Sequence, residues 1–269
     1  MKYTDKFVAF IDILGFKQIV EKSVIIEDAE SIARMIKRLA PESDIAFYQN
    51  DGAEICPCSE SYSSDLAMRI SQISDCVVIS AEISAAGVIN IIHYCQKVAE
   101  RLLLRESVLC QGYLTRGKIV HDGMMFFGPG YQAAVEGEKQ AASIEWRGEV
   151  LGTPFIEIDP DVVAYLKSHG DDCTHEMFTR MTVRGTTESY ISPYGIFDRL
   201  ANWASDPSKS PDQIFKEFNI ANSIIERIEK DIAASKPKNL RAREKLRITQ
   251  EELSKARERL AEAQSMILS

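Results

Sequence analysis

The chain begins with an apolar run that contains a single carboxylate. In "FVAFIDILGF", residues 7–16, apolar side chains flank Asp12 on both sides, and the run turns at Gly15. An apolar run rich in Phe, Val and Ile predicts a buried strand. An ionised carboxylate in such a strand costs free energy unless a metal ion, a charge partner or a reaction makes use of it. Asp12 is therefore the first candidate functional residue.

Downstream segments alternate between helical and extended patterns. Apolar residues recur at helical spacing within residues 26–39, and residues 66–80 predict two strands joined tightly at Ser74–Asp75. Further elements are predicted as a helix at 85–104, a strand at 107–120, a helix at 131–144, a strand at 150–159 and a helix at 160–168. The stretches 40–65 and 121–130 are expected to be loops. This order predicts an α+β fold with helices packed on one sheet.

After about Asp206 the pattern changes to a heptad repeat. Apolar or small residues step by four and three at Ile214, Phe218, Ala221, Ile225, Ile228 and Ile232, and again at Leu246, Thr249, Leu253, Ala256, Leu260, Ala263 and Ile267. The break at "KPKN" between the two series favours an antiparallel helical hairpin. We therefore divide the chain into a main domain at residues 1–204 and a helical hairpin at 205–269 that packs on it or supports dimerisation.

Composition narrows the class of protein. Of 269 residues, 45% are hydrophobic and 27% are charged, as in soluble globular proteins. The net charge of −8 weighs against a nucleic-acid partner. The sequence has no apolar run of about 20 residues for a membrane span and no secretory pattern in "MKYTDKF". The six cysteines are scattered, so we expect thiols in a reducing, cytoplasmic environment.

A second carboxylate, Asp75, also lies between apolar strand residues in "QISDCVVIS". If the strands that carry Asp12 and Asp75 are neighbours, the two side chains converge and a divalent cation relieves their repulsion. Two such cations about 4 Å apart are a common device for phosphoryl transfer. The turn at Gly15 would then present backbone N–H groups to phosphates. The alternative for Asp75 is that it only caps a turn.

Four segments in chain order resemble motifs of class III nucleotidyl cyclases. They are "FIDILGF" at 10–16, "SD" at 74–75, "TRGKIVHDG" at 115–123 and "FGPGYQAAVEGEKQA" at 127–141. The resemblance covers about the first 200 residues. It implies a class III cyclase-like α+β sandwich with a ferredoxin-like βαββαβ core, which makes residues 1–204 the catalytic domain. "GxGxxG" after the first strand and the P-loop motif are absent from the sequence, so the Rossmann and P-loop folds have little support.

The resemblance also implies the site residues and the partners. Asp12 and Asp75 would bind two Mn²⁺ or Mg²⁺ ions, with the Ile13 carbonyl as a further ligand. The turn that binds the triphosphate would consist of Leu14, Gly15 and Phe16. The active protein would be a homodimer whose sites are shared, with metals from one subunit and base contacts from the other.

The chain departs from the family at the positions that read the base and stabilise the transition state. Ser71 stands where purine cyclases have Lys or Glu, and Met125 stands where they have Asp or Cys. Gln132 can replace the helical Asn of the family, whereas Glu136 cannot replace its Arg. Arg116 is the first candidate for the missing cation; the alternative is that it forms a salt bridge at a sheet edge.

A retained metal site with a changed base pocket resembles the pyrimidine cyclases of Pycsar anti-phage systems. These enzymes make cyclic UMP or cyclic CMP, which activates a partner effector. Tyr48 and Arg69 are candidates to fill or read the pyrimidine pocket, and Arg69 lies two positions from Ser71 on the same strand face. The alternatives are a purine cyclase, a non-catalytic nucleotide-binding homologue and a polymerase-like palm domain. His121 is expected in a turn, and no histidine is assigned to catalysis.

Overall fold

The computed structural model describes residues 1–50, 55–61, 66–140, 144–146, 149–151, 154–184, 189–235 and 240–268. Its main feature is an eight-stranded mixed sheet with the order β2-β3-β1-β4-β8-β10-β9, in which β5 pairs with β4 alone. The strands are β1 (Thr4–Ile13), β2 (Arg69–Ile73), β3 (Cys76–Ala81), β4 (Cys110–Asp122), β5 (Met125–Phe127), β8 (Ile156–Ile158), β9 (Thr182–Arg184) and β10 (Ser189–Ile191). Strands β6 (Ile144–Trp146) and β7 (Glu149–Leu151) form a separate hairpin.

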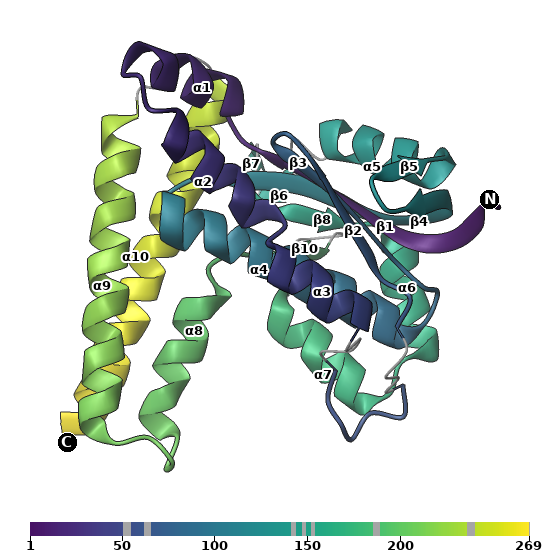
Figure 1. The fold of residues 1–269 in the computed structure, drawn as a ribbon. Helices are drawn as coiled ribbons and strands as arrows, with labels where there is room; N and C mark the ends of the chain where they lie inside the picture. The colour runs from purple at the N-terminus through teal and green to yellow at the C-terminus, as the bar shows by residue number, and fades with distance from the viewer. Residues whose placement is uncertain are drawn as a thin grey trace.

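Helices cover the sheet and flank it (Figure 1). They are α1 (Phe16–Ile25), α2 (Ala29–Leu39), α3 (Glu42–Asn50), α4 (Ala85–Glu106), α5 (Pro129–Gln140), α6 (Pro160–His169), α7 (Asp172–Met181), α8 (Gly195–Ala201), α9 (Pro211–Ala234), α10 (Leu240–Leu268) and a 3₁₀ turn, η1 (Asn202–Ser205). From β1 to β4 the chain runs strand, helices, two strands, helix, strand. The predicted α+β class and βαββαβ order are confirmed.

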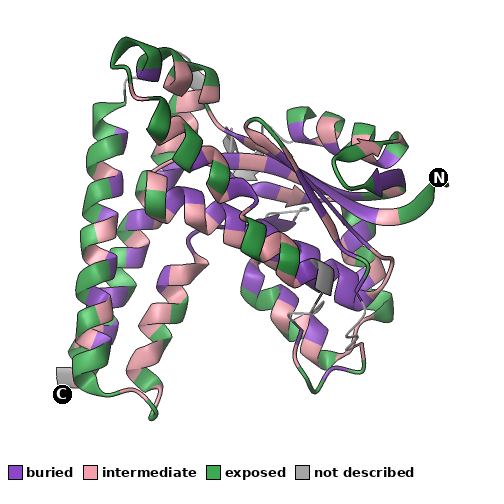
Figure 2. Cartoon of the chain, viewed as in Figure 1, coloured by how far each residue is buried: buried purple, intermediate pink, exposed green. Residues whose placement is uncertain are grey.

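Strand β1 is buried on both faces, as its apolar run predicted (Figure 2). Every second side chain, including Phe7 and Ile11, joins the large core that α4 covers. The intervening Val8 and Phe10 join a smaller core with Ala134 of α5. Because side chains alternate along a strand, Asp12 points to the same face as Val8 and Phe10, the face that α5 covers.

Two glycines let α5 lie directly on β4. A Cβ atom at Gly117 would lie 2.7 Å from the Cα of Gly130, and one at Gly130 would lie 2.9 Å from the carbonyl carbon of Gly117. Real Cβ atoms do not approach backbone this closely, so any larger residue at either position forces the helix away from the strand. Gly117 of β4 and Gly130 in the first turn of α5 are therefore packing requirements of the α5 face.

The C-terminal helices form the predicted antiparallel pair, and Figure 1 shows α9 and α10 side by side along one flank. All six predicted seam residues of α9 are buried, as are Thr249, Leu253, Ala256, Leu260 and Ala263 of α10. The core they form also contains residues from the main domain: Leu103, Phe155, Tyr190, Tyr194 and Phe197. The division after residue 204 stays a prediction, but one apolar core extends across that boundary.

Two stretches expected to be loops contain regular structure. Residues 42–50 form helix α3, because Pro41 starts the turn and Tyr48 packs edge-on against Tyr94 of α4. Residues 121–130 hold the end of β4, all of β5 and the start of α5. Their polar and glycine-rich composition hid the β4–β5 hairpin, which closes at Gly123 with φ +55°.

The shared core makes the hairpin part of the cooperative fold. Leu253→Ala removes a fully buried side chain and leaves a cavity, so we expect it to lower the free energy of unfolding by about 2–5 kcal/mol. Ile220→Ala, on the exposed side of α9, is the matched control and should cost far less. Urea unfolding followed by circular dichroism and by tryptophan fluorescence should give one coincident transition. Two separate transitions would contradict a shared core.

Candidate active site

Asp12 and Asp75 meet at one end of the sheet. Asp12 is the penultimate residue of β1, and Asp75 lies in the tight turn between β2 and β3, where Ser74 adopts φ +53°. The Ile13 N–H donates to the Asp75 carbonyl at 3.2 Å, which ties this turn to the end of β1. Carboxylate oxygens of both aspartates and the sulfur of Cys76 lie within 4.8 Å of one another. Within the described residues, this is the group of acidic, His or Cys side chains that could hold a metal ion.

The electrostatics of the pair favour a cation. The pKa of Asp12 is raised to about 6, mainly by burial and then by the negative charges of Asp75 and Glu138, against a hydrogen bond from Cys76 that lowers it. The Cys76 thiol donates to Asp12 Oδ1 at 3.4 Å, and burial raises its own pKa well above the usual range. In the metal-free protein the thiol is therefore protonated, and the carboxylate oxygens of Asp12 and Asp75 are ligands that Mg²⁺ and Mn²⁺ prefer. The donor set fits a hard divalent cation.

The predicted triphosphate turn follows β1 directly. Gly15 adopts φ +73°, and the Leu14 N–H donates to the Leu109 carbonyl at 2.9 Å, which holds the turn against the chain before β4. Helix α1 begins at Phe16 and has no side-chain cap at its N-terminus. The N–H groups of an uncapped first turn can donate hydrogen bonds to a bound anion. Leu14, Gly15 and Phe16 thus lie next to the aspartate pair in the order that the motif implied.

The sequence analysis did not predict the cluster of polar side chains beside Asp12, which consists of Gln111, Glu138 and Lys245. Gln111 lies directly opposite Asp12 in the β1–β4 register, so both side chains point to the α5 face. Its Nε2 donates to the carboxylate of Glu138, and its Oε1 accepts from Lys245 Nζ. Glu138 is only 6% exposed, and helical spacing from the buried Ala134 could have placed it on the inner face of α5. No local pattern could have brought Lys245, 134 positions from Gln111, to this place.

A buried hydrogen-bond network lies where the base-reading positions were predicted. Ser71 is 1% exposed, and its hydroxyl donates to the Gly123 carbonyl at 2.5 Å. It therefore accepts from Nε2–H of His121 at 2.9 Å, which leaves Nδ1 to accept from Ser80 at 2.8 Å. Burial, followed by the charges of Lys6 and Arg69, lowers the pKa of His121 to about 4, so the ring is neutral.

This network corrects the expectation that His121 lies in a turn, because it is a buried residue of β4. It brings Ser71 to the hairpin that carries Met125, which is 43% exposed and pairs with Asp122. Arg69 Nη1 donates to the Met68 carbonyl at 2.9 Å, and its charge acts on His121, so it lies near the same network. Three of the predicted base-pocket positions are thus gathered in one region.

The structure does not bring two predicted residues to the aspartate pair. Arg116 pairs with Phe7, five positions along β4 from Gln111, and its guanidinium contacts the Tyr165 ring of α6 rather than α5. It binds Asp5 at 2.7 Å beside a cavity of about 550 Å³, which corresponds to the salt-bridge alternative. Tyr48 is fully buried in the core on the α4 side. Neither residue is available to a nucleotide at Asp12 of its own chain.

Gln132 and Glu136 lie on the exposed side of α5, whereas Ala134 and Glu138 face the sheet. Residues on the exposed side of a helix cannot also contact the sheet that its opposite side packs against. Gln132 therefore cannot act on the Asp12–Asp75 pair of its own chain.

No protein-family model matches the chain, and no curated protein matches it. Solved structures do. A bacterial light-regulated adenylyl cyclase is 16% identical with a TM-score of 0.43, covering 72% of this chain and 92% of that chain. A second such structure is 14% identical with a TM-score of 0.41, covering 71% and 53%. The catalytic core of a rhodopsin-guanylyl cyclase with converted specificity, in complex with ATPαS, is 14% identical with a TM-score of 0.37, covering 70% and 94%. The likeness concerns the fold and identifies no substrate.

The raised pKa of Asp12 predicts a pH-dependent loss of stability. In the unfolded chain this group ionises near its ordinary pKa of 3.8, whereas the folded protein holds the proton until about pH 6. The metal-free protein should therefore lose stability as the pH rises between these values and keep it below them. Because Asp12 is half-exposed and screened by water, we expect Asp12→Asn to stabilise the metal-free protein at pH 7 by only about 1 kcal/mol.

Urea unfolding in EDTA at pH 4 and pH 7 measures this difference. Glu226→Gln, at an exposed position in the middle of α9, removes a carboxylate without changing the site and should show no such gain. An Asp12→Asn variant that is less stable than the wild type at pH 7 would show that the Asp12 charge is compensated in the folded protein.

Proposed function

We propose that the protein is a class III-type nucleotidyl cyclase that converts a pyrimidine nucleoside triphosphate, UTP or CTP, into the 3′,5′-cyclic monophosphate and pyrophosphate. The observation that carries this proposal is the convergence of Asp12 and Asp75 beside the uncapped turn at Gly15. The motif order of the sequence and the βαββαβ fold support the same reading.

The reaction needs a triphosphate held in line with its own ribose. Asp12, Asp75 and the Ile13 carbonyl would hold two Mn²⁺ or Mg²⁺ ions, which supply Lewis acidity and charge neutralisation when bound. In the turn Leu14–Phe16, the N–H groups of Gly15 and Phe16 would orient the β- and γ-phosphates, and Leu14 would fix the turn through its bond to Leu109. The 3′-oxygen forms a bond to the α-phosphorus, the bond to the bridging oxygen of pyrophosphate breaks, and the 3′-hydroxyl proton passes to solvent.

The base region supports a pyrimidine rather than a purine. Reading a purine edge takes a donor and an acceptor side chain at the positions of Ser71 and Met125. The Ser71 hydroxyl is already satisfied by Gly123 and His121, and the thioether of Met125 offers no donor. Arg69 is the nearby residue that can hydrogen-bond a base carbonyl.

The position of α5 supports a homodimer with shared sites. Gln132 is exposed on the side of α5 that faces away from its own sheet, so it can act only on a triphosphate held by a second copy. The hairpin of α9 and α10 is a candidate to support that dimer.

The biological setting in the proposal rests on the family resemblance alone. The cyclic pyrimidine nucleotide would serve as a second messenger in anti-phage defence, made in the cytoplasm and read by a separate effector. Among the described helices, none has the length and apolar character that a bilayer crossing requires.

Product analysis tests the reaction. Wild-type protein with Mn²⁺ and UTP or CTP should yield the cyclic monophosphate, and Asp75→Ala should lower the rate by roughly a hundredfold or more, because metal charge stabilisation contributes several kcal/mol. Parallel reactions with ATP and GTP separate the alternatives. A cyclic purine product would overturn the pyrimidine assignment. Nucleotide binding without any cyclic product would leave a non-catalytic binding protein.

Subunit complementation tests the shared site. Asp12→Asn and Gln132→Ala should each be strongly impaired alone. In an equal mixture after subunit exchange, half of the dimers carry one intact site of two, so about one quarter of the wild-type activity should return. Full loss in the mixture, with dimers confirmed by mass in solution, would place metals and Gln132 in the same chain.

A further inference from the structure

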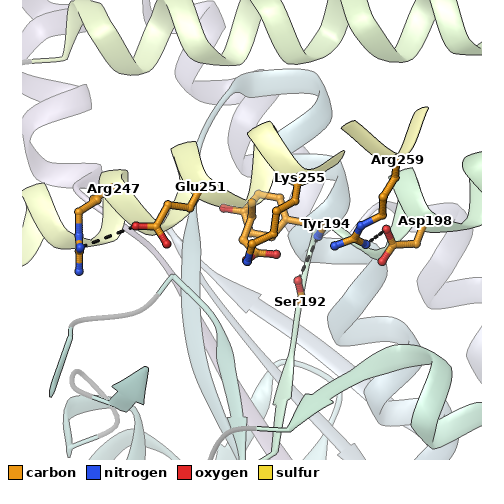
Figure 3. Close-up of polar contacts among 8 residues, drawn as sticks. Ser192, Tyr194, Asp198, Arg247, Glu251, Lys255 and Arg259 are labelled. Carbon is orange, nitrogen blue, oxygen red and sulfur yellow. Dashed lines mark hydrogen bonds and ion pairs between the residues drawn. The ribbon is translucent and has the colours of Figure 1, made fainter. Parts of the chain in front are cut away.

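Helix α10 is fixed against the main domain by a chain of buried hydrogen bonds. The hydroxyl of Tyr194, a buried core residue, donates to Thr249 Oγ1 at 2.8 Å. Thr249 Oγ1 in turn donates to the carbonyl of Lys245, one turn earlier, at 2.9 Å. Figure 3 shows Tyr194 against α10 and, further along the helix, the ion pair of Asp198 with Arg259. The turn that carries Lys245 therefore has a fixed place relative to the sheet.

From that turn Lys245 reaches the row of side chains that contains Asp12. Its half-buried ammonium group donates to Gln111 Oε1, and Gln111 is the direct cross-strand neighbour of Asp12. Side chains directly opposite in an antiparallel pair have Cβ atoms roughly 5 Å apart. The ammonium group of Lys245 is thus hydrogen-bonded to the side chain that lies beside Asp12, a candidate metal ligand.

With a nucleoside triphosphate bound, the site would carry more negative charge than two divalent cations can balance. Asp12, Asp75 and Glu138 contribute carboxylates, and a nucleoside triphosphate would bring further negative charge. The position on α5 that the family uses for a cation holds the acid Glu136. Arg116, the cation expected from the sequence, lies five positions further along β4 than Gln111 and on the opposite face.

We propose that Lys245 binds the phosphates of the substrate, in the same chain as the metal-binding aspartates, and supplies the cation that α5 lacks. This inference rests on the proposed function. Gln111 holds the ammonium group in place, and the C-terminal hairpin thereby becomes part of the active site. A lysine ammonium group is a compact point charge of the kind that binds phosphate oxygens.

Calorimetric titration of inorganic tripolyphosphate into the protein with Mn²⁺ tests this without turnover. Lys245→Met should weaken binding about tenfold or more, the order expected for one charge-assisted contact, and Lys245→Arg should recover most of it. Lys230→Met, on the exposed side of α9, removes the same charge far from the site and should bind as the wild type does. The KM for the nucleotide should rise in Lys245→Met by a similar factor.

A double variant separates phosphate binding from a purely structural role. If Lys245 served only to compensate the buried Glu138, adding Glu138→Gln to Lys245→Met would restore tripolyphosphate binding and overturn the proposal. If Lys245 contacts phosphate, the double variant stays weak. Wild-type affinity in Lys245→Met, together with cyclic product from the wild type, overturns this inference alone. A wild type that binds no tripolyphosphate and makes no cyclic nucleotide overturns both proposals.

Discussion

The pairing of β1 between β3 and β4 determines both the core and the site. One set of alternating β1 side chains builds the core under α4, and the other set builds the core under α5 and ends at Asp12. The same register places Cys76 on one side of Asp12 and Gln111 on the other. A slip of one residue would turn Asp12 into the α4 core, where a carboxylate has no partner, and would turn the core side chains outward. The burial of apolar side chains and the cost of burying the Asp12 carboxylate therefore favour the same strand register.

The second core extends this logic to the far end of the chain. Heptad packing between α9 and α10 alone would not fix the position of the hairpin relative to the sheet. Phe155, Tyr190 and Tyr194 of the main domain, however, pack among the seam residues of both helices. The hairpin consequently has one position relative to the sheet. Its ion pairs, such as Arg257 with Glu229, are exposed and add little stability, so apolar contacts and the Tyr194–Thr249 hydrogen bond determine the placement.

What the sequence could predict depended on whether the signal was local. The strand at Asp12, the tight turn at Asp75, the long helix α4 and both heptad seams have periodicity or turn chemistry within a short window, and all were predicted. Helix α3 was missed because polar residues surround its few packing side chains. Tyr48 and Arg116 were misplaced because a single sequence does not say which face of the sheet a residue occupies. The contact of Lys245 with Gln111 depends on the packing of two cores, and no pattern in the sequence around either residue indicates it.

The place of Lys245 late in the chain has a consequence during synthesis. Ribosomes make a protein from its N-terminus, and domains begin to fold as they emerge. While α10 is still unmade, the nascent chain already contains Asp12, Asp75 and Glu138 but not their neighbouring cation. The unfinished protein would carry the carboxylates of the site without its lysine, and completion of the last helix would be the step that balances them.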